Sequence, residues 1–116
     1  MLILRSMIIF EKTTHLSSII EKSEENPVVI FKYSSKCYTS EELKQKLEQA
    51  KVSGAIKYLI FLVVVQDSPI LSKKIEAIFK IKHESPQIIV LYKNQVTYFE
   101  SHDKIVIENL QNVSIQ

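Results

Sequence analysis

The chain has 116 residues, a net charge of +2 and 24% charged residues of both signs. This length fits one domain, which we expect to span residues 1–116, and 46% hydrophobic residues suffice for a core without disulfide or metal. The balanced charge, with no basic stripe interleaved with aromatic residues, argues against nucleic acid as a partner.

The apolar segments are too short for a membrane protein. Residues 1–10 are interrupted by Arg5 and lack a long apolar region and a small-residue cleavage site, so we expect no signal peptide. The longest apolar run, Tyr58 to Val65, is far below the roughly 18 residues of a membrane span. We therefore expect a cytoplasmic protein that does not bind membranes.

The single glycine, Gly54, argues against a glycine-rich phosphate cradle.

In the first half of the chain, strand and helix patterns alternate. We expect a short strand over 7–11, a helix over 14–26 with Thr14 as its N-cap, a strand over 28–33 and a helix over 40–53. The strand over 28–33 is rich in β-branched residues, which is typical of a buried strand. Gly54 is placed to end the second helix.

The second half begins with the same alternation and closes with a hairpin. We expect a strand over 58–65 buried on both faces, a helix opened by Pro69, strands over 87–92 and 96–99, and a last helix capped by Asp103. The order is β-α-β-α-β-α-β-β-α. It predicts an α/β fold in which helices flank a central mixed sheet, the element order of a thioredoxin-like protein.

Cys37, the only cysteine, lies between a predicted strand and the helix that follows it. It cannot form an internal disulfide, and a lone thiol fits a reducing compartment. The helix N-terminus and the neighbouring Lys36 should both lower the pKa of this thiol. Backbone N–H groups around Thr39 and Ser40, and the Ser40 hydroxyl, are placed to donate hydrogen bonds to the sulfur.

Two alternatives stay open for Cys37. Residues 39–42 also match a capping box with Thr39 as N-cap and Glu42 reaching back, which would leave Cys37 outside the helix with less benefit from its dipole. A lone cysteine is also often a small, inert core residue. Ser40 stands where a two-thiol enzyme has its second cysteine. If Cys37 is reactive, an outside thiol must therefore resolve any mixed disulfide that it forms.

A second segment, residues 83–87, precedes a predicted strand. Pro86 is suited to open that strand, and cis X–Pro bonds are rare enough that the residues favour a trans bond. His83 and Glu84 are read as a solvated pair, and His102 as exposed or locally bonded. One cysteine and three scattered histidines give weak evidence for a metal, and we expect none.

These segments resemble the monothiol bacilliredoxins, the YtxJ-like proteins of the bacillithiol system. Residues 31–40, Phe-Lys-Tyr-Ser-Ser-Lys-Cys-Tyr-Thr-Ser, are similar to the active-site segment of that family. Residues 82–87, Lys-His-Glu-Ser-Pro-Gln, are similar to its second signature, and residues 101–105 to its closing segment. Tyr38 replaces the family proline after the cysteine, Tyr33 replaces a histidine, and Lys36 stands where threonine is frequent.

The resemblance implies a thioredoxin-like fold with Cys37 as the redox nucleophile. It implies a cis Ser85–Pro86 bond facing the thiol, with the Ser85 backbone pairing with the bound partner and Tyr38 at the rim of the substrate site. The implied activity is that of a cytoplasmic thiol-disulfide oxidoreductase without a bound cofactor. It would remove bacillithiol, its co-substrate, from S-thiolated client proteins.

The same residues bear on two other functions. A thioredoxin-like binding module would use the cleft near Pro86 without redox turnover, and the bulky Tyr33 and Tyr38 suit a contact surface. An iron–sulfur carrier of the monothiol glutaredoxin kind needs a glycine soon after the cysteine, and Tyr38 is bulky there.

Overall fold

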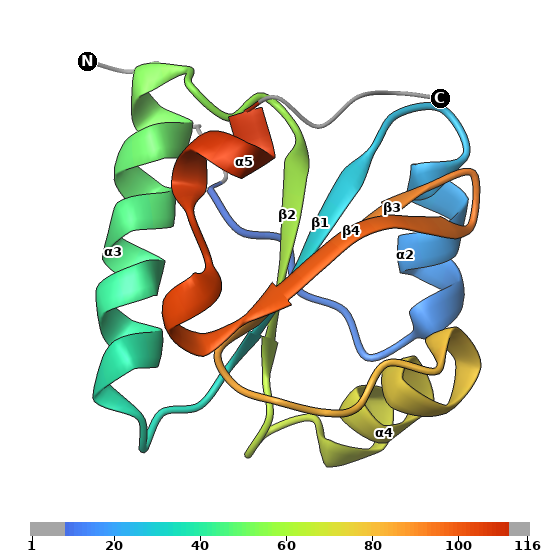
Figure 1. Cartoon of the computed structure of the whole chain (residues 1–116). Coiled ribbons are helices and arrows are strands. Elements are labelled where there is room, and N and C mark those ends of the chain that lie inside the picture. The colour runs from blue at the N-terminus through green and yellow to red at the C-terminus, as the bar shows by residue number, and fades with distance from the viewer. Residues whose placement is uncertain (1–8, 112–116) are drawn as a thin grey trace.

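A computed structural model describes residues 9–111, which form one four-stranded sheet with helices on both faces (Figure 1). In chain order the elements are α2 (Leu16–Ser23), β1 (Val28–Tyr33), α3 (Tyr38–Ser53), β2 (Leu59–Val64), α4 (Pro69–Phe79), β3 (Gln87–Tyr92), β4 (Gln95–Ser101), the 3-10 helix η1 (His102–Lys104) and α5 (Ile107–Gln111). The strand order is β2-β1-β3-β4. β1 pairs parallel with β2 and antiparallel with β3, and β3 pairs antiparallel with β4. The predicted mixed sheet is thus confirmed.

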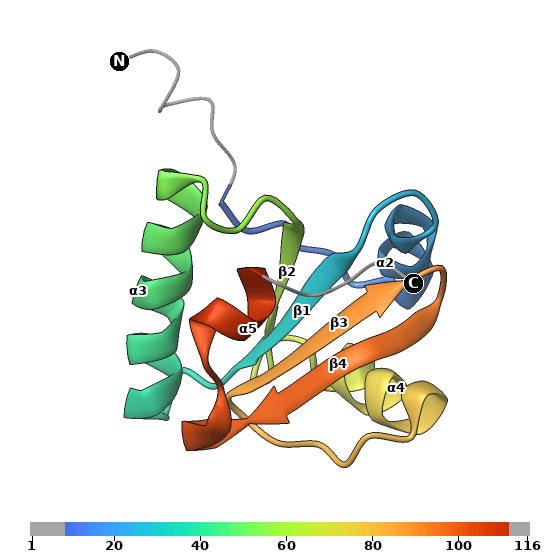
Figure 2. The same ribbon diagram turned by 45° about the horizontal axis from the view of Figure 1, so that its top comes forward.

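The sheet separates two hydrophobic clusters. Figure 2 shows the sheet and the helices on its two faces from a second direction. α2 and α4 cover one face, and α3 and α5 cover the other. Alternate residues of β1 point into each cluster: Val28 and Ile30 into the first, Val29 and Phe31 into the second. A strand buried on both faces needs apolar side chains at consecutive positions, which explains why β1 shows no alternation.

The beginning of the chain departs from the prediction in two ways. Residues 7 and 8 of the expected first strand lie outside the described residues, and Glu11 forms an isolated parallel bridge with Phe61. The expected N-cap, Thr14, is wrong, because α2 begins at Leu16 with His15 at the N-cap position. Thr13 instead accepts a hydrogen bond from the backbone N–H of His15 through its hydroxyl, at 3.1 Å, so the local turn replaces a side-chain cap.

The last predicted helix is also corrected, since it is two short pieces. η1 covers His102–Lys104 and α5 covers Ile107–Gln111, with Ile105 in an extended conformation between them. Asp103 therefore lies inside η1 and is not an N-cap. The break allows Leu110 to reach the cluster beneath α3, where its side chain is fully buried.

Candidate functional site

Cys37 is the N-cap residue of α3. Its backbone is extended, with φ −117° and ψ 118°, and its carbonyl accepts the N–H groups of Ser40 at 3.1 Å and Glu41 at 3.3 Å. The alternative with Thr39 as N-cap is wrong, because α3 begins two residues earlier than expected, at Tyr38. The half-buried sulfur therefore lies at the positive end of a 16-residue helix, where a thiolate is favoured.

Hydrogen-bond donors near the sulfur lower the pKa of Cys37 below its ordinary value. The largest contribution comes from the Thr39 hydroxyl, whose Oγ1 lies 2.9 Å from Sγ, and the next from the backbone N–H of Ser40. Slight burial opposes these effects, and the Ser40 hydroxyl adds a smaller lowering. In contrast to the prediction, Lys36 is not among the groups that shift this pKa. Its side chain is exposed, where solvent and salt screen the ammonium charge.

Ser40 is completely buried and supports the loop that leads to the cysteine. Its Oγ accepts the backbone N–H of Ser34 at 3.2 Å, and the Cys37 N–H donates to the Ser34 carbonyl at 3.2 Å. These bonds close a turn over residues 34–37. Ser40 thus acts on the site in two ways, through its N–H and hydroxyl on the sulfur and through its hold on the preceding loop.

Gln66, which sequence reasoning did not identify, fixes the same loop from the connection between β2 and α4. Its Oε1 accepts the Ser35 N–H at 3.1 Å, and its Nε2 donates to Ser34 Oγ at 2.7 Å. An exposed glutamine in a loop carries no sequence signal for this role. Only the parallel pairing of β1 and β2 places their carboxyl ends, and hence these residues, side by side.

Tyr33 joins the end of β1 to the first turn of α3. Its hydroxyl donates to Glu41 Oε1 at 2.6 Å, which raises the pKa of Tyr33 and lowers the pKa of Glu41. Lys44 lies over the Tyr33 ring, 5.6 Å from its centroid. Tyr38, by contrast, is 77% exposed at the start of α3, as expected for a rim residue.

The Ser85–Pro86 peptide bond is cis, as the family resemblance implied and contrary to the trans bond that the residues favoured. Pro86 is buried, and Ser85 is half-buried. The His102 N–H donates to the Pro86 carbonyl at 2.9 Å, and the His102 side chain pairs with Glu84. His83 and Glu84 are therefore not a solvated pair, because each has a partner from another part of the chain.

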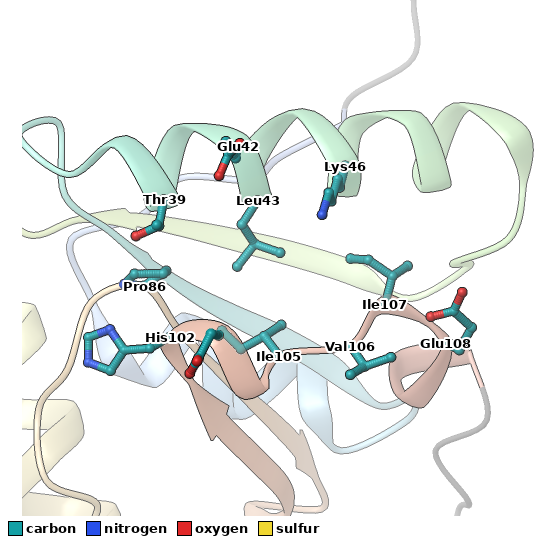
Figure 3. Close-up of a pocket in the computed structure, with 11 residues that line it drawn as sticks. Thr39, Glu42, Leu43, Lys46, Pro86, His102, Ile105, Val106, Ile107 and Glu108 are labelled. Carbon is teal, nitrogen blue, oxygen red and sulfur yellow. The ribbon is translucent and has the colours of Figure 1, made fainter.

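A groove of about 540 Å³ begins beside this segment and runs between α3 and the η1–α5 segment (Figure 3). Thr39, Pro86 and His102 lie at one end, and Leu43 and Ile107 contribute apolar side chains to its walls. Lys46 points its ammonium group toward the space between α3 and α5. Since Thr39 also contacts the Cys37 sulfur, the groove opens next to the thiol.

Among residues 9–111, no group of three or more His, Cys, Asp or Glu side chains is arranged to hold a metal ion. No helix in this part of the chain is both long and apolar enough to cross a membrane. The chemistry that the site offers is that of one activated thiol beside a cis-proline segment.

Solved structures show the same fold. One is described as a candidate oxidoreductase with a thioredoxin fold; it is 22% identical with a TM-score of 0.78, and the match covers 90% of this chain and 93% of that one. A thioredoxin from Fasciola hepatica is 12% identical with a TM-score of 0.71, covering 93% and 100%. Mitochondrial thioredoxin 3 from Saccharomyces cerevisiae is 16% identical with a TM-score of 0.62, covering 78% and 81%. The predicted thioredoxin-like fold is confirmed.

No curated protein is similar enough in sequence to match the chain. The sequence does match a protein family, described as monothiol bacilliredoxin BrxC, over residues 9–110. This range contains the Cys37 loop, the cis Ser85–Pro86 segment and the residues of the groove. The family and the fold together support a thiol redox role, and the chain belongs to the monothiol bacilliredoxin BrxC family.

Proposed function

We propose that the protein is a monothiol thiol-disulfide oxidoreductase that removes a low-molecular-weight thiol, bacillithiol, from mixed disulfides with client proteins. The observation that carries this proposal is the position of Cys37. Its sulfur is accessible, lies at the start of α3, has a lowered pKa and sits beside the groove that Pro86 lines. The thiolate is the attacking species in disulfide exchange, and a lowered pKa increases the thiolate fraction at a given pH.

The first step transfers the small thiol to Cys37. The Cys37 thiolate attacks the small-thiol sulfur of the mixed disulfide, and a new S–S bond forms as the bond to the client breaks. The client leaves as a thiolate and takes up a proton from solvent. Thr39 and Ser40 favour the attacking thiolate, because their hydroxyl and N–H groups lower the pKa of Cys37.

The second step needs an outside thiol, because a serine hydroxyl at position 40 cannot take part in disulfide exchange. A second molecule of the small thiol attacks the small-thiol sulfur of the Cys37 mixed disulfide. The products are the disulfide of the small thiol and the free Cys37 thiolate. The lone cysteine suits the reducing environment of the cytoplasm, where we place this reaction.

The groove next to Cys37 is the proposed site for the rest of the small thiol. Its walls combine apolar side chains with the Lys46 ammonium and the carboxylates of Glu42, Asp103 and Glu108. This lining suits a compact molecule that carries both a carboxylate, facing Lys46, and a basic group. The backbone of the half-buried Ser85 would pair with the polypeptide that holds the mixed disulfide, and the exposed Tyr38 would contact this partner at the rim.

A binding module without turnover is the second candidate, favoured by the 77% exposure of Tyr38 beside the thiol. Such a module would retain a partner in the Cys37→Ser variant, while the wild type would show no reductase activity.

Intact mass spectrometry tests the proposed reaction directly. Reduced protein is mixed with a bacillithiolated client, and the mass of each chain is followed. We expect a gain of one bacillithiol on Cys37 with loss of the same mass from the client, and no transfer in Cys37→Ser. Persistence of the modified client beside unmodified wild-type protein would contradict the proposal.

A further inference from the structure

Lys32 is a fully buried lysine in β1. It lies on the sheet face that α2 and α4 cover, opposite Phe31, which packs toward α3. Its Nζ donates to the Ser72 carbonyl at 3.1 Å and lies 3.3 Å from Nδ1 of His83. Burial lowers the pKa of Lys32 to about 8, and the opposing attraction of Glu76 is smaller. Burying an ammonium costs desolvation free energy, which its hydrogen bonds must offset. An apolar side chain would fill the same space without that cost, so the retained charge indicates a role beyond packing.

The groups around Lys32 converge on the connection between α4 and β3. Ser72 Oγ lies 3.3 Å from His83 Nδ1, and Glu76 Oε2 accepts the backbone N–H of His83 at 2.8 Å. Gln87 Nε2 donates to the Lys82 carbonyl at 3.0 Å. We call Lys32, Ser72, Glu76, His83 and Gln87 the anchor cluster. It ties residues 82 and 83 to β1, α4 and β3, and residue 83 is separated from the cis Ser85–Pro86 bond by Glu84 alone.

While Lys32 is protonated, its contact with His83 constrains the tautomer of the imidazole ring. Because the Lys32 ammonium can only donate, Nδ1 of His83 must accept, which puts the ring proton on Nε2. Burial first, and then the nearby Lys32 charge, lower the pKa of His83, with Glu76 and Glu84 opposing. Lys32 therefore contacts the ring of a neutral His83, and the Glu76 carboxylate accepts the His83 backbone N–H. Both the side chain and the backbone of His83 are fixed in this way.

We propose that the anchor cluster holds the Ser85–Pro86 segment in the geometry that binds a mixed disulfide, with Lys32, Glu76 and His83 as positioning residues. This inference rests on the proposed function. No member of the cluster is among the groups that shift the pKa of Cys37, so we expect it to act on binding rather than on the chemistry of the sulfur. A segment fixed before the partner arrives loses less entropy on binding, which lowers KM.

The main test compares Lys32→Met with Lys73→Met. Methionine fills the space of Lys32 without the ammonium, and Lys73 is exposed on α4 next to Ser72, so its replacement is a matched loss of charge. Steady-state removal of bacillithiol from a defined client should show KM raised about tenfold in Lys32→Met, with kcat changed less than about twofold. The pH profile of Cys37 alkylation should be the same in both variants. Lys73→Met should match the wild type.

Amide hydrogen exchange gives a second readout that does not need reductase activity. Lys32→Met should speed exchange at residues 82–85 while the core strands exchange as before. Should Lys32→Met fail to fold, the pair Glu76→Ala and Glu76→Gln replaces it. Alanine removes the acceptor of the His83 N–H, whereas the glutamine amide oxygen can still accept it, so only Glu76→Ala should raise KM and speed exchange.

The outcomes separate this inference from the proposed function. An inactive wild type refutes the proposed function, and unchanged exchange at residues 82–85 in the variants then refutes the positioning role as well. An active wild type with unchanged KM in folded Lys32→Met or Glu76→Ala overturns the inference alone. A fall in kcat with an altered alkylation profile would also overturn it, since the cluster would then act on the thiol.

Discussion

The hydroxyl oxygen of Thr39 lies 2.9 Å from the sulfur of Cys37 and makes the largest contribution to the lowered pKa of this thiol. The two side chains come together because Cys37 is the N-cap of α3, so that Thr39 lies in the first turn above it. The reactivity of the thiol therefore depends on where the helix starts.

Replacing Thr39 by valine should raise the pKa of Cys37 toward its ordinary value, because a methyl group cannot donate to the thiolate. Alkylation of Cys37 by iodoacetamide at pH 7 should slow several-fold, and the pH midpoint of the rate should move upward. Thr39→Ser keeps a hydroxyl and should resemble the wild type. An unshifted profile in Thr39→Val would show that the helix start alone activates the thiol.

Gln66→Ala should lower the free energy of unfolding by about 1 kcal/mol, because it removes the two hydrogen bonds from Gln66 to Ser34 and Ser35. Urea unfolding measures this change. Amide exchange at residues 34–36 should also become faster, since Gln66 Oε1 accepts the Ser35 N–H. Gln66→Glu keeps an acceptor at the same position and should lose less stability. Equal losses in both variants would contradict the role of Ser35 as the partner.

Lys46→Gln should weaken discrimination in favour of a thiol that bears a carboxylate. The Cys37 mixed disulfide is resolved with N-acetylcysteine or with its amide, and the ratio of the two rates is compared between proteins. We expect the ratio to fall about threefold in Lys46→Gln, the effect of one exposed ion pair. Intrinsic differences between the two thiols cancel in this comparison. Lys57→Gln, outside the groove, should leave the ratio unchanged, and an equal fall there would show a nonspecific charge effect.

The stability of the wild type should rise with pH where Lys32 releases its proton. The pKa of Lys32 is about 8 in the folded chain and 10.5 in its ordinary state, so between these values the unfolded chain binds more protons. This group alone then adds stability as pH increases, roughly 3 kcal/mol when complete. Urea unfolding at pH 7 and pH 9.5 should show that Lys32→Met lacks the gain. Parallel pH dependence in both proteins would indicate that Lys32 is not perturbed.

Local pattern was enough to predict most of the sheet. The consecutive apolar residues of β1 and β3 report burial on both faces, and the helix over 38–53 ends at Gly54, whose φ of 83° suits glycine. The position of Cys37 between strand and helix was also readable. The residues at which helices begin were harder to predict. Thr14 and Asp103 have side chains typical of N-caps, but the packing of Leu16 and of Leu110 into the two clusters sets where those helices run.

The surroundings of the thiol required contacts between residues far apart in the chain. Lys32 and His83 are 51 positions apart, and Ser35 and Gln66 are 31 apart. Sequence periodicity reports which neighbours along one strand or helix share a face, and it carries no information on what lies across the sheet. The parallel pairing of β1 with β2 brings Gln66 to the Cys37 loop, and the packing of α4 on β1 brings Lys32 to His83. The chain thus encodes its nucleophile locally, whereas the groups that hold the site around it meet only when the sheet and its covering helices assemble.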